Sequence, residues 1–123
     1  MKGASFRLPR TTTTGPNATT VLIGRMPANS LITFRYSAAA LASTNVFKAW
    51  NGSASAQRTG TGTPTISAGN APAIDPVLLP PAWTITPISN ASGDVGLTLN
   101  PVLAAAGLVI VWEIEITPVI NVF

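Results

Sequence analysis

The sequence contains no cysteine and no histidine. The missing cysteine excludes disulfides, thiolate metal sites and thiol nucleophiles. The missing histidine removes the side chain most used for proton transfer near neutral pH and the most common metal ligand. Any paired-carboxylate chemistry would have to come from four acids: Asp75, Asp94, Glu113 and Glu115. We therefore expect a protein that is not an enzyme and that holds no cofactor and no metal.

Charge is also scarce, at 9% of the residues against about 25% in an ordinary soluble domain. Such a surface indicates either a membrane protein or a subunit that is buried in an assembly. The longest apolar run, residues 102–112, is well short of the roughly 20 residues that a spanning helix needs. The first residues also lack the apolar core of a signal peptide. We expect no membrane partner, synthesis in the cytoplasm, and a homo-oligomer or larger assembly.

The few charges are ordered along the chain. All seven basic residues lie in its first half, and all four acids lie from Asp75 onward. Either this order arises by chance, or the basic N-terminal segment docks on an acidic surface such as that of a neighbouring copy. Nucleic acid is not an expected partner, because the basic residues are scattered singly and form neither a cluster nor a platform with aromatic residues.

The strongest strand pattern lies in residues 108–116. Alternation places one set of side chains in the core and the other on an outer face that is apolar at one end and charged at the other. The outer set is Val109, Val111, Glu113 and Glu115. We predict that this half-covered face contacts another strand or another chain, with the glutamates either solvated or in intersubunit salt bridges to Arg25 or Arg35. Residues 94–99 alternate as well, and the two segments predict strands joined by a bend.

Further strands are predicted over residues 19–24 and 30–36, which we expect to form an antiparallel pair, and over residues 46–50 and 82–86. Asn51-Gly52 predicts a tight turn after the third of these. The Ala/Ser-rich residues 37–45 indicate a helical turn or a loop. Residues 53–81, rich in Ser, Thr, Gly and Pro, predict a long surface loop. Residues 117–123, after a proline break at Pro118, predict an edge strand or a tail that packs on a partner.

Turn signals about every ten residues, with no convincing helix, predict an all-β fold: a single antiparallel β-sandwich, jelly-roll-like or Ig-like. The sandwich spans residues 19–123, and residues 1–18 form an extended N-terminal arm or an edge strand. We predict that the arm contacts a partner through Phe6, Arg7, Leu8 and Arg10. The three tryptophans, Trp50, Trp83 and Trp112, are expected to fill the core.

Three segments resemble a type of small bacteriophage virion protein. In that family a Gly-x-Leu-Pro-Ala-Gly turn joins two strands, and an Asp-Val-x-Val-x-Leu strand and a Gly-rich turn precede a last valine-rich strand. Here Gly24-Arg25-Met26-Pro27-Ala28-Asn29 is similar to the first element, with Asn29 in place of the final Gly. Residues 94–99 are similar to the Asp-Val-x-Val-x-Leu strand, and residues 106–116 are similar to the Gly-rich turn and the last strand. The resemblance implies a β-sandwich subunit of a phage head or tail, such as a capsid decoration (cement) protein.

The leading hypothesis is thus a non-enzymatic virion structural protein that binds and stabilises the capsid, with the major capsid protein or other virion subunits as partners and the virion as its location. The alternatives are a carbohydrate- or receptor-binding module of a head or tail fibre, with residues 53–81 as its contact surface, and a structural subunit of the tail or neck.

Overall fold

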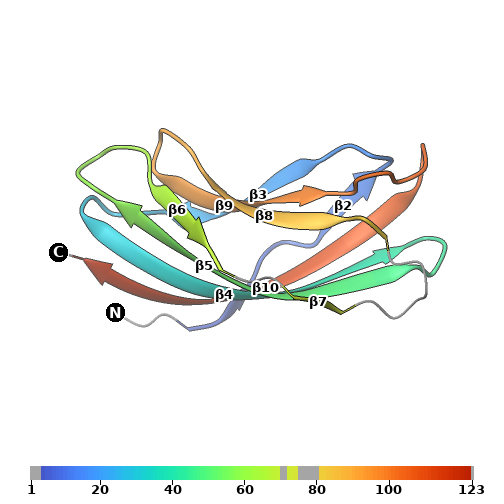
Figure 1. The fold of residues 1–123 in the computed structure, drawn as a ribbon, viewed down its shortest axis with the longest axis horizontal. Helices are drawn as coiled ribbons and strands as arrows, with labels where there is room; N and C mark the ends of the chain where they lie inside the picture. The colour runs from blue at the N-terminus through green and yellow to red at the C-terminus, as the bar shows by residue number, and fades with distance from the viewer. Residues whose placement is uncertain (1–3, 70–71, 75–80, 123) are drawn as a thin grey trace.

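The computed structural model describes residues 4–69, 72–74 and 81–122, and it shows an all-β fold of two antiparallel sheets, as predicted (Figure 1). The larger sheet has seven strands in the order β1-β10-β4-β5-β6, with β2 also paired to β10 and β7 to β5. The smaller sheet has the order β3-β9-β8. The strands are β1 (Phe6–Arg7), β2 (Thr11–Thr14), β3 (Thr19–Arg25), β4 (Ser30–Ala42), β5 (Phe47–Arg58), β6 (Thr65–Ala68), β7 (Ala73–Ile74), β8 (Thr84–Ser89), β9 (Asp94–Asn100) and β10 (Val109–Val122).

The three predicted core tryptophans are buried together between the sheets. The rings of Trp50 and Trp112 stack with centroids 5.6 Å apart, and Trp83 lies tilted against Trp112 at 6.2 Å. In the sheet, Ala38 is the cross-strand neighbour of Trp50, and Ala40 is that of Trp112. Small side chains at these positions leave room for the large rings, as close packing requires.

Most of the Ala/Ser-rich segment 37–45 is strand and not the predicted helical turn or loop, and only residues 43–45 form a turn. The strand part of the segment continues β4 to Ala42, with alternate residues buried. Alanine has little preference for strands, but here it is paired on both sides, by β5 and by β10. Tertiary packing therefore overrides local propensity in this segment.

The predicted turn at Asn51-Gly52 is wrong, because β5 runs through it to Arg58. Gly52 lies opposite Tyr36, and a Cβ at Gly52 would come within 2.0 Å of the Tyr36 ring. The glycine thus makes room for a ring and does not mark a turn. Residues 53–58 consequently belong to a strand and not to the predicted loop of residues 53–81. Within the rest of that loop, β6 and β7 form, and residues 70–71 and 75–80 lie outside the described residues.

One predicted strand pairing is also wrong. β3 and β4 do not pair with each other, since β3 pairs with β9 in the smaller sheet. β9 and β10 are strands joined by a bend, as predicted, and this bend carries the chain from one sheet to the other. The turn before β4 contains Asn29 with a φ of 54°, a left-handed conformation that glycine adopts freely and asparagine tolerates.

The predicted break at Pro118 is absent, because β10 runs from Val109 to Val122 without interruption. Pro118 pairs with Phe34 of β4 and lies beyond Ile116, the last β10 residue that pairs with β1. A proline is tolerated where a strand borders the edge of a sheet, because its missing N–H is not needed there.

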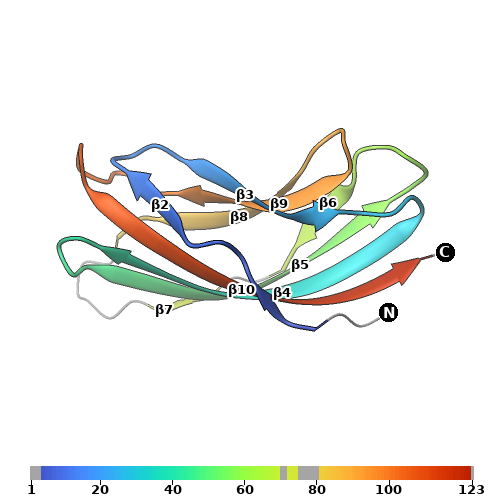
Figure 2. The same cartoon turned by 180° about the vertical axis from the view of Figure 1, so that it is seen from behind.

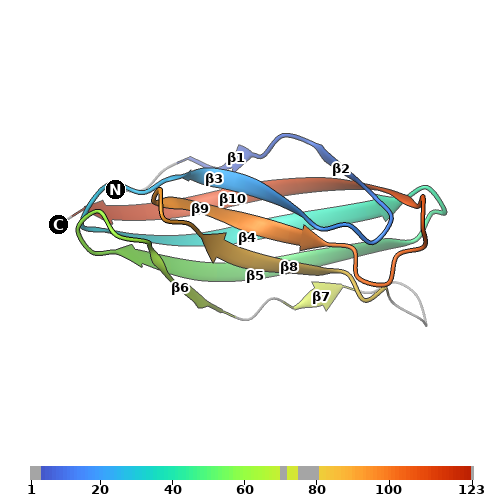
Figure 3. The same cartoon turned by 90° about the horizontal axis from the view of Figure 1, so that it is seen from above.

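The N-terminal arm lies along the edge of the larger sheet (Figure 3). β1 and β2 pair with β10 of the same chain, so the arm forms an edge of its own sandwich. The side chain of Leu8 is buried in the core, and the indole of Trp112 donates a hydrogen bond to Thr13. Figures 1 and 2 show the larger sheet bowed, with both ends bending toward the smaller sheet, so its outer face is convex.

Candidate partner-binding surface

The candidate site is the outer face of the seven-stranded sheet, the side that points away from the smaller sheet. β10 contributes the predicted residues Val109, Val111, Glu113 and Glu115, all at least partly exposed, while Ile110, Trp112, Ile114 and Ile116 are buried. The predicted alternation of this strand is confirmed. β10 has β4 on one side and β1 and β2 on the other along this stretch, so these residues offer a surface of side chains and not a free backbone edge.

The arm adds two of its predicted residues to the same face. Arg7 is the cross-strand neighbour of Glu115, and Arg10 Nε lies 3.9 Å from Glu113 Oε1. Both partners of the second pair are well exposed, so the pair contributes at most about 1 kcal/mol to stability. A basic segment thus docks on an acidic strand within one chain. Arg25, a predicted partner of the glutamates, instead lies 3.7 Å from Asp94.

The other two predicted arm residues point away from the outer face. Leu8 is held in the chain's own core, whereas Phe6 is exposed to 39%. Phe6 lines a hollow of about 150 Å³ between the sheets, together with Ile23, Met26 and Pro118. Alternation in β1 separates Phe6 from Arg7, because neighbours along a strand point to opposite faces. Arg10 lies on the same face as Arg7 because residues 8–10 are not in a strand and interrupt the alternation. Arg7 and Arg10 remain candidates for partner contact, and Leu8 is not accessible in this structure.

Sequence reasoning missed the contribution of β4 and β5 to this face. Leu41 is the cross-strand neighbour of both Val111 and Phe47, so the three form one row across the sheet. Leu41 and Phe47 are 52% and 43% exposed. With Val109 they make the apolar end of the outer face, beside a shallow hollow of about 360 Å³ that Arg10 and Glu113 also line. The sequence did contain a signal for Leu41. Thr33 and Arg35 were expected to point outward, and steps of two residues along the same strand lead from them to Leu41.

The other half of the outer face carries small polar side chains. Ser37 Oγ donates to Asn51 Oδ1 at 3.1 Å, and the hydroxyls of Thr33 and Ser55 are 3.2 Å apart. Arg35 is exposed in the same region and lines a further shallow hollow of about 460 Å³. Short side chains that are already hydrogen-bonded lose little conformational freedom when a partner covers them.

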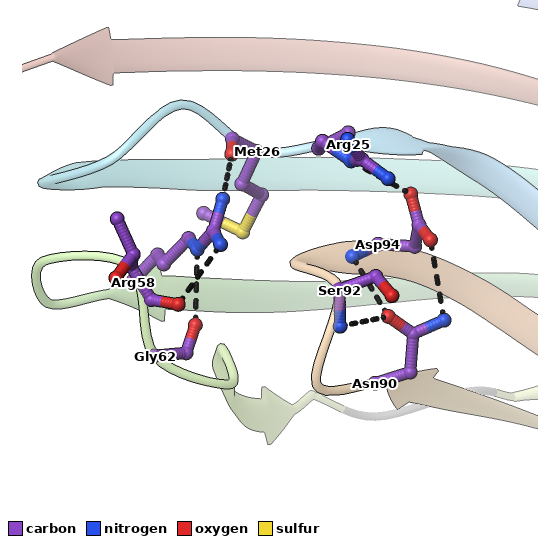
Figure 4. Close-up of polar contacts among 8 residues, drawn as sticks. Arg25, Met26, Arg58, Gly62, Asn90, Ser92 and Asp94 are labelled. Carbon is purple, nitrogen blue, oxygen red and sulfur yellow. Dashed lines mark hydrogen bonds and ion pairs between the residues drawn. The ribbon is translucent and has the colours of Figure 1, made fainter.

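A polar cluster at one end of the sandwich has a structural role (Figure 4). The Arg58 guanidinium is buried and donates hydrogen bonds to the carbonyls of Met26, Thr61 and Gly62, at 2.6, 3.0 and 2.9 Å. Residues 60–63 have a superficial likeness to a phosphate loop, yet the carbonyls of Thr61 and Gly62 face this arginine. Arg58 therefore ties the β3–β4 turn to the β5–β6 turn.

Among the described residues, no group of three or more His, Cys, Asp or Glu lies close enough to hold a metal ion. Glu113 and Glu115 lie side by side on the exposed face of one strand, which is not the arrangement of two carboxylates that flank a substrate. The described residues contain no helix long and apolar enough to cross a membrane.

No protein-family model matches this sequence, and searches of curated proteins and of solved structures return no match. The function is therefore argued from the surface itself.

Proposed function

We propose that the protein is a non-enzymatic structural subunit of a phage virion, a decoration protein that binds the capsid through the outer face of its seven-stranded sheet. The observation that carries the proposal is this face, where exposed Leu41, Phe47 and Val109 lie beside Arg10 and Glu113 on paired strands. Exposed apolar side chains gathered in one place and rimmed by polar ones are typical of protein interaction sites.

The size of the face supports association with a large partner. β4 has 13 residues, so with about 3.3 Å per residue and about 4.8 Å between strands, the surface over β10, β4 and β5 is roughly 600 Å². A standard interface covers about 800 Å² on each partner. One copy thus offers most of an interface, and many copies bound to a symmetric particle gain further from multivalency.

The sequence supports the same proposal independently. Its low charge suits a protein whose surface is mostly covered by other subunits. Residues 24–29, 94–99 and 106–116 resemble segments of phage virion proteins.

The carbohydrate-binding alternative has less support. Sugar-binding modules commonly stack exposed aromatic rings against the sugar, but Trp50 and Trp83 are both buried in the core. These two residues therefore do not form a stacking platform.

The proposal is tested by expressing the chain together with the major capsid protein of the same phage and sedimenting the assembled shells. The wild-type chain is expected to sediment with the shells, and Leu41→Glu to remain unbound. Leu22→Glu on β3 of the other sheet is the matched control, because Leu22 is exposed to 51% and Leu41 to 52%. Absence of the wild-type chain from the shells, or equal loss of binding in both variants, would overturn the proposal.

A further inference from the structure

The N-terminal arm is bound by a receiving strip on one strand, β10. From one end to the other, Ser5 Oγ lies 2.9 Å from Thr117 Oγ1, the Leu8 N–H donates to the Ile114 carbonyl, and the Trp112 indole donates to Thr13. Leu8 adds an apolar anchor in the core. The docking site for the arm is thus largely provided by residues 108–117, without help from the segment that links the arm to β3.

Arm and strip are also complementary in charge. Arg7 and Arg10 of the arm lie against Glu115 and Glu113 of the strip. Residues 4–14 are extended and, at about 3.3 Å per residue, reach roughly 35 Å. This length is enough to cover the corresponding strip on an adjacent molecule, and the charges favour docking in the same register.

The segment between the arm and the sandwich is suited to act as a hinge. It is the short stretch Gly15-Pro16-Asn17-Ala18, with Gly15 at a φ of 65°. A Cβ on Gly15 would meet no atom closer than 3.5 Å, so the glycine is required by its backbone angle and not by crowding. A different pair of angles at this glycine redirects the whole arm, with β1 and β2, while the smaller sheet and the other strands of the larger sheet keep their places.

We infer that the arm exchanges between two copies of this chain, so that residues 4–14 of one molecule pair with β10 of another and the reverse. The exchanged pair keeps the contacts between the arm and β10, so the concentration of neighbouring copies decides between the closed and the exchanged form. For a short linker the intramolecular form competes at an effective concentration on the order of millimolar. We expect closed monomers in dilute solution and exchanged arms where copies crowd together. This inference does not rest on the proposed function.

The absence of cysteine allows a direct test by single-cysteine crosslinking. Thr12 and Val111 are cross-strand neighbours on the outer face. Because the Gly15 N–H bonds the Leu108 carbonyl, alternation makes Thr12–Val111 a non-hydrogen-bonded pair, with Cα atoms about 4.5 Å apart. That separation permits a disulfide. T12C and V111C chains of different mass are unfolded together, refolded at about 1 mM, comparable to the effective concentration, and oxidised.

Exchange predicts a T12C–V111C mixed dimer several-fold more abundant than the homodimers that either variant forms alone. A mixture of L41C and F47C chains is the control for chance collisions, because this exposed cross-strand pair belongs to the β4–β5 hairpin. The double variant T12C/V111C should oxidise within one chain at about 1 µM, far below the effective concentration. A mixed dimer no more abundant than the homodimers or the control would overturn the inference.

Discussion

The indole nitrogen of Trp112 donates a hydrogen bond to the hydroxyl of Thr13, with the two atoms 2.9 Å apart. This buried contact joins the N-terminal arm to the largest fully buried side chain of the core. The arm is therefore part of the folding unit and not an appendage to it.

Thr13→Val should lower the free energy of unfolding by about 1–3 kcal/mol, because it leaves a buried indole N–H without an acceptor while it preserves the shape of the side chain. Thr12→Val is the matched control, since Thr12 is exposed on the same strand and a change there should stay within about 0.5 kcal/mol. Urea unfolding followed by tryptophan fluorescence measures both. Equal effects of the two variants would show that the hydrogen bond does not hold the arm.

Gly52→Ala should destabilise the protein by about 3 kcal/mol, because the new methyl group would overlap the buried ring of Tyr36. Gly24→Ala on β3 is the control, since a Cβ there meets nothing within 4 Å. Thermal unfolding compares the two variants. A Gly52→Ala protein as stable as Gly24→Ala would mean that the ring of Tyr36 lies elsewhere.

Arg58→Met should cost about 2–4 kcal/mol, because it removes hydrogen bonds from a charged donor to three carbonyls and leaves those carbonyls unpaired. Arg35→Met removes the same charge from the exposed outer face and should change stability by less than about 0.5 kcal/mol. Chemical denaturation of both variants distinguishes a structural arginine from a surface one, and similar midpoints would exclude the structural role.

Burial raises the pKa of Tyr36 above its ordinary value of 10.0. Above pH 10 the unfolded chain releases the phenolic proton while the folded chain retains it, so the stability that Tyr36 contributes falls as the pH rises from 10 through the folded-state pKa. Tyr36 is the only tyrosine in the sequence, so tyrosinate absorbance reports on it alone. The native protein should titrate at a higher pH than the chain in denaturant, and coinciding titrations would contradict the burial of Tyr36.

The faces of β10 were predictable because its branched side chains alternate with period two, and a pattern of that kind is local. The same local signal fails in residues 37–42, because the sequence Ser-Ala-Ala-Ala-Leu-Ala does not alternate between polar and apolar side chains. Their strand conformation depends on Trp50 and Trp112, which lie opposite Ala38 and Ala40. Likewise, Asn51-Gly52 has the sequence of a turn, but the ring of Tyr36 determines the role of the glycine.

The candidate surface was predictable in part for a related reason. Val109, Val111, Glu113 and Glu115 share a face because of their spacing, whereas Leu41 and Phe47 join them only through the pairing of β4 with its neighbours. The arm depends on both residue spacing and strand pairing. Alternation separates Arg7 from Phe6 and Leu8, but the sequence does not specify which strand the arm pairs with.

The amino-acid sequence alone determined the all-β class, the tryptophan core and the buried and exposed sides of β10, because composition and period-two alternation are properties of short segments. Tertiary structure decided which strands pair, that the bends before β4 and β10 cross between the sheets, and that the basic arm lies on the acidic strand of its own chain. Those choices depend on contacts between residues far apart in sequence. Turn residues such as Pro27 and Asn29 suit a hairpin and a crossing between sheets equally well.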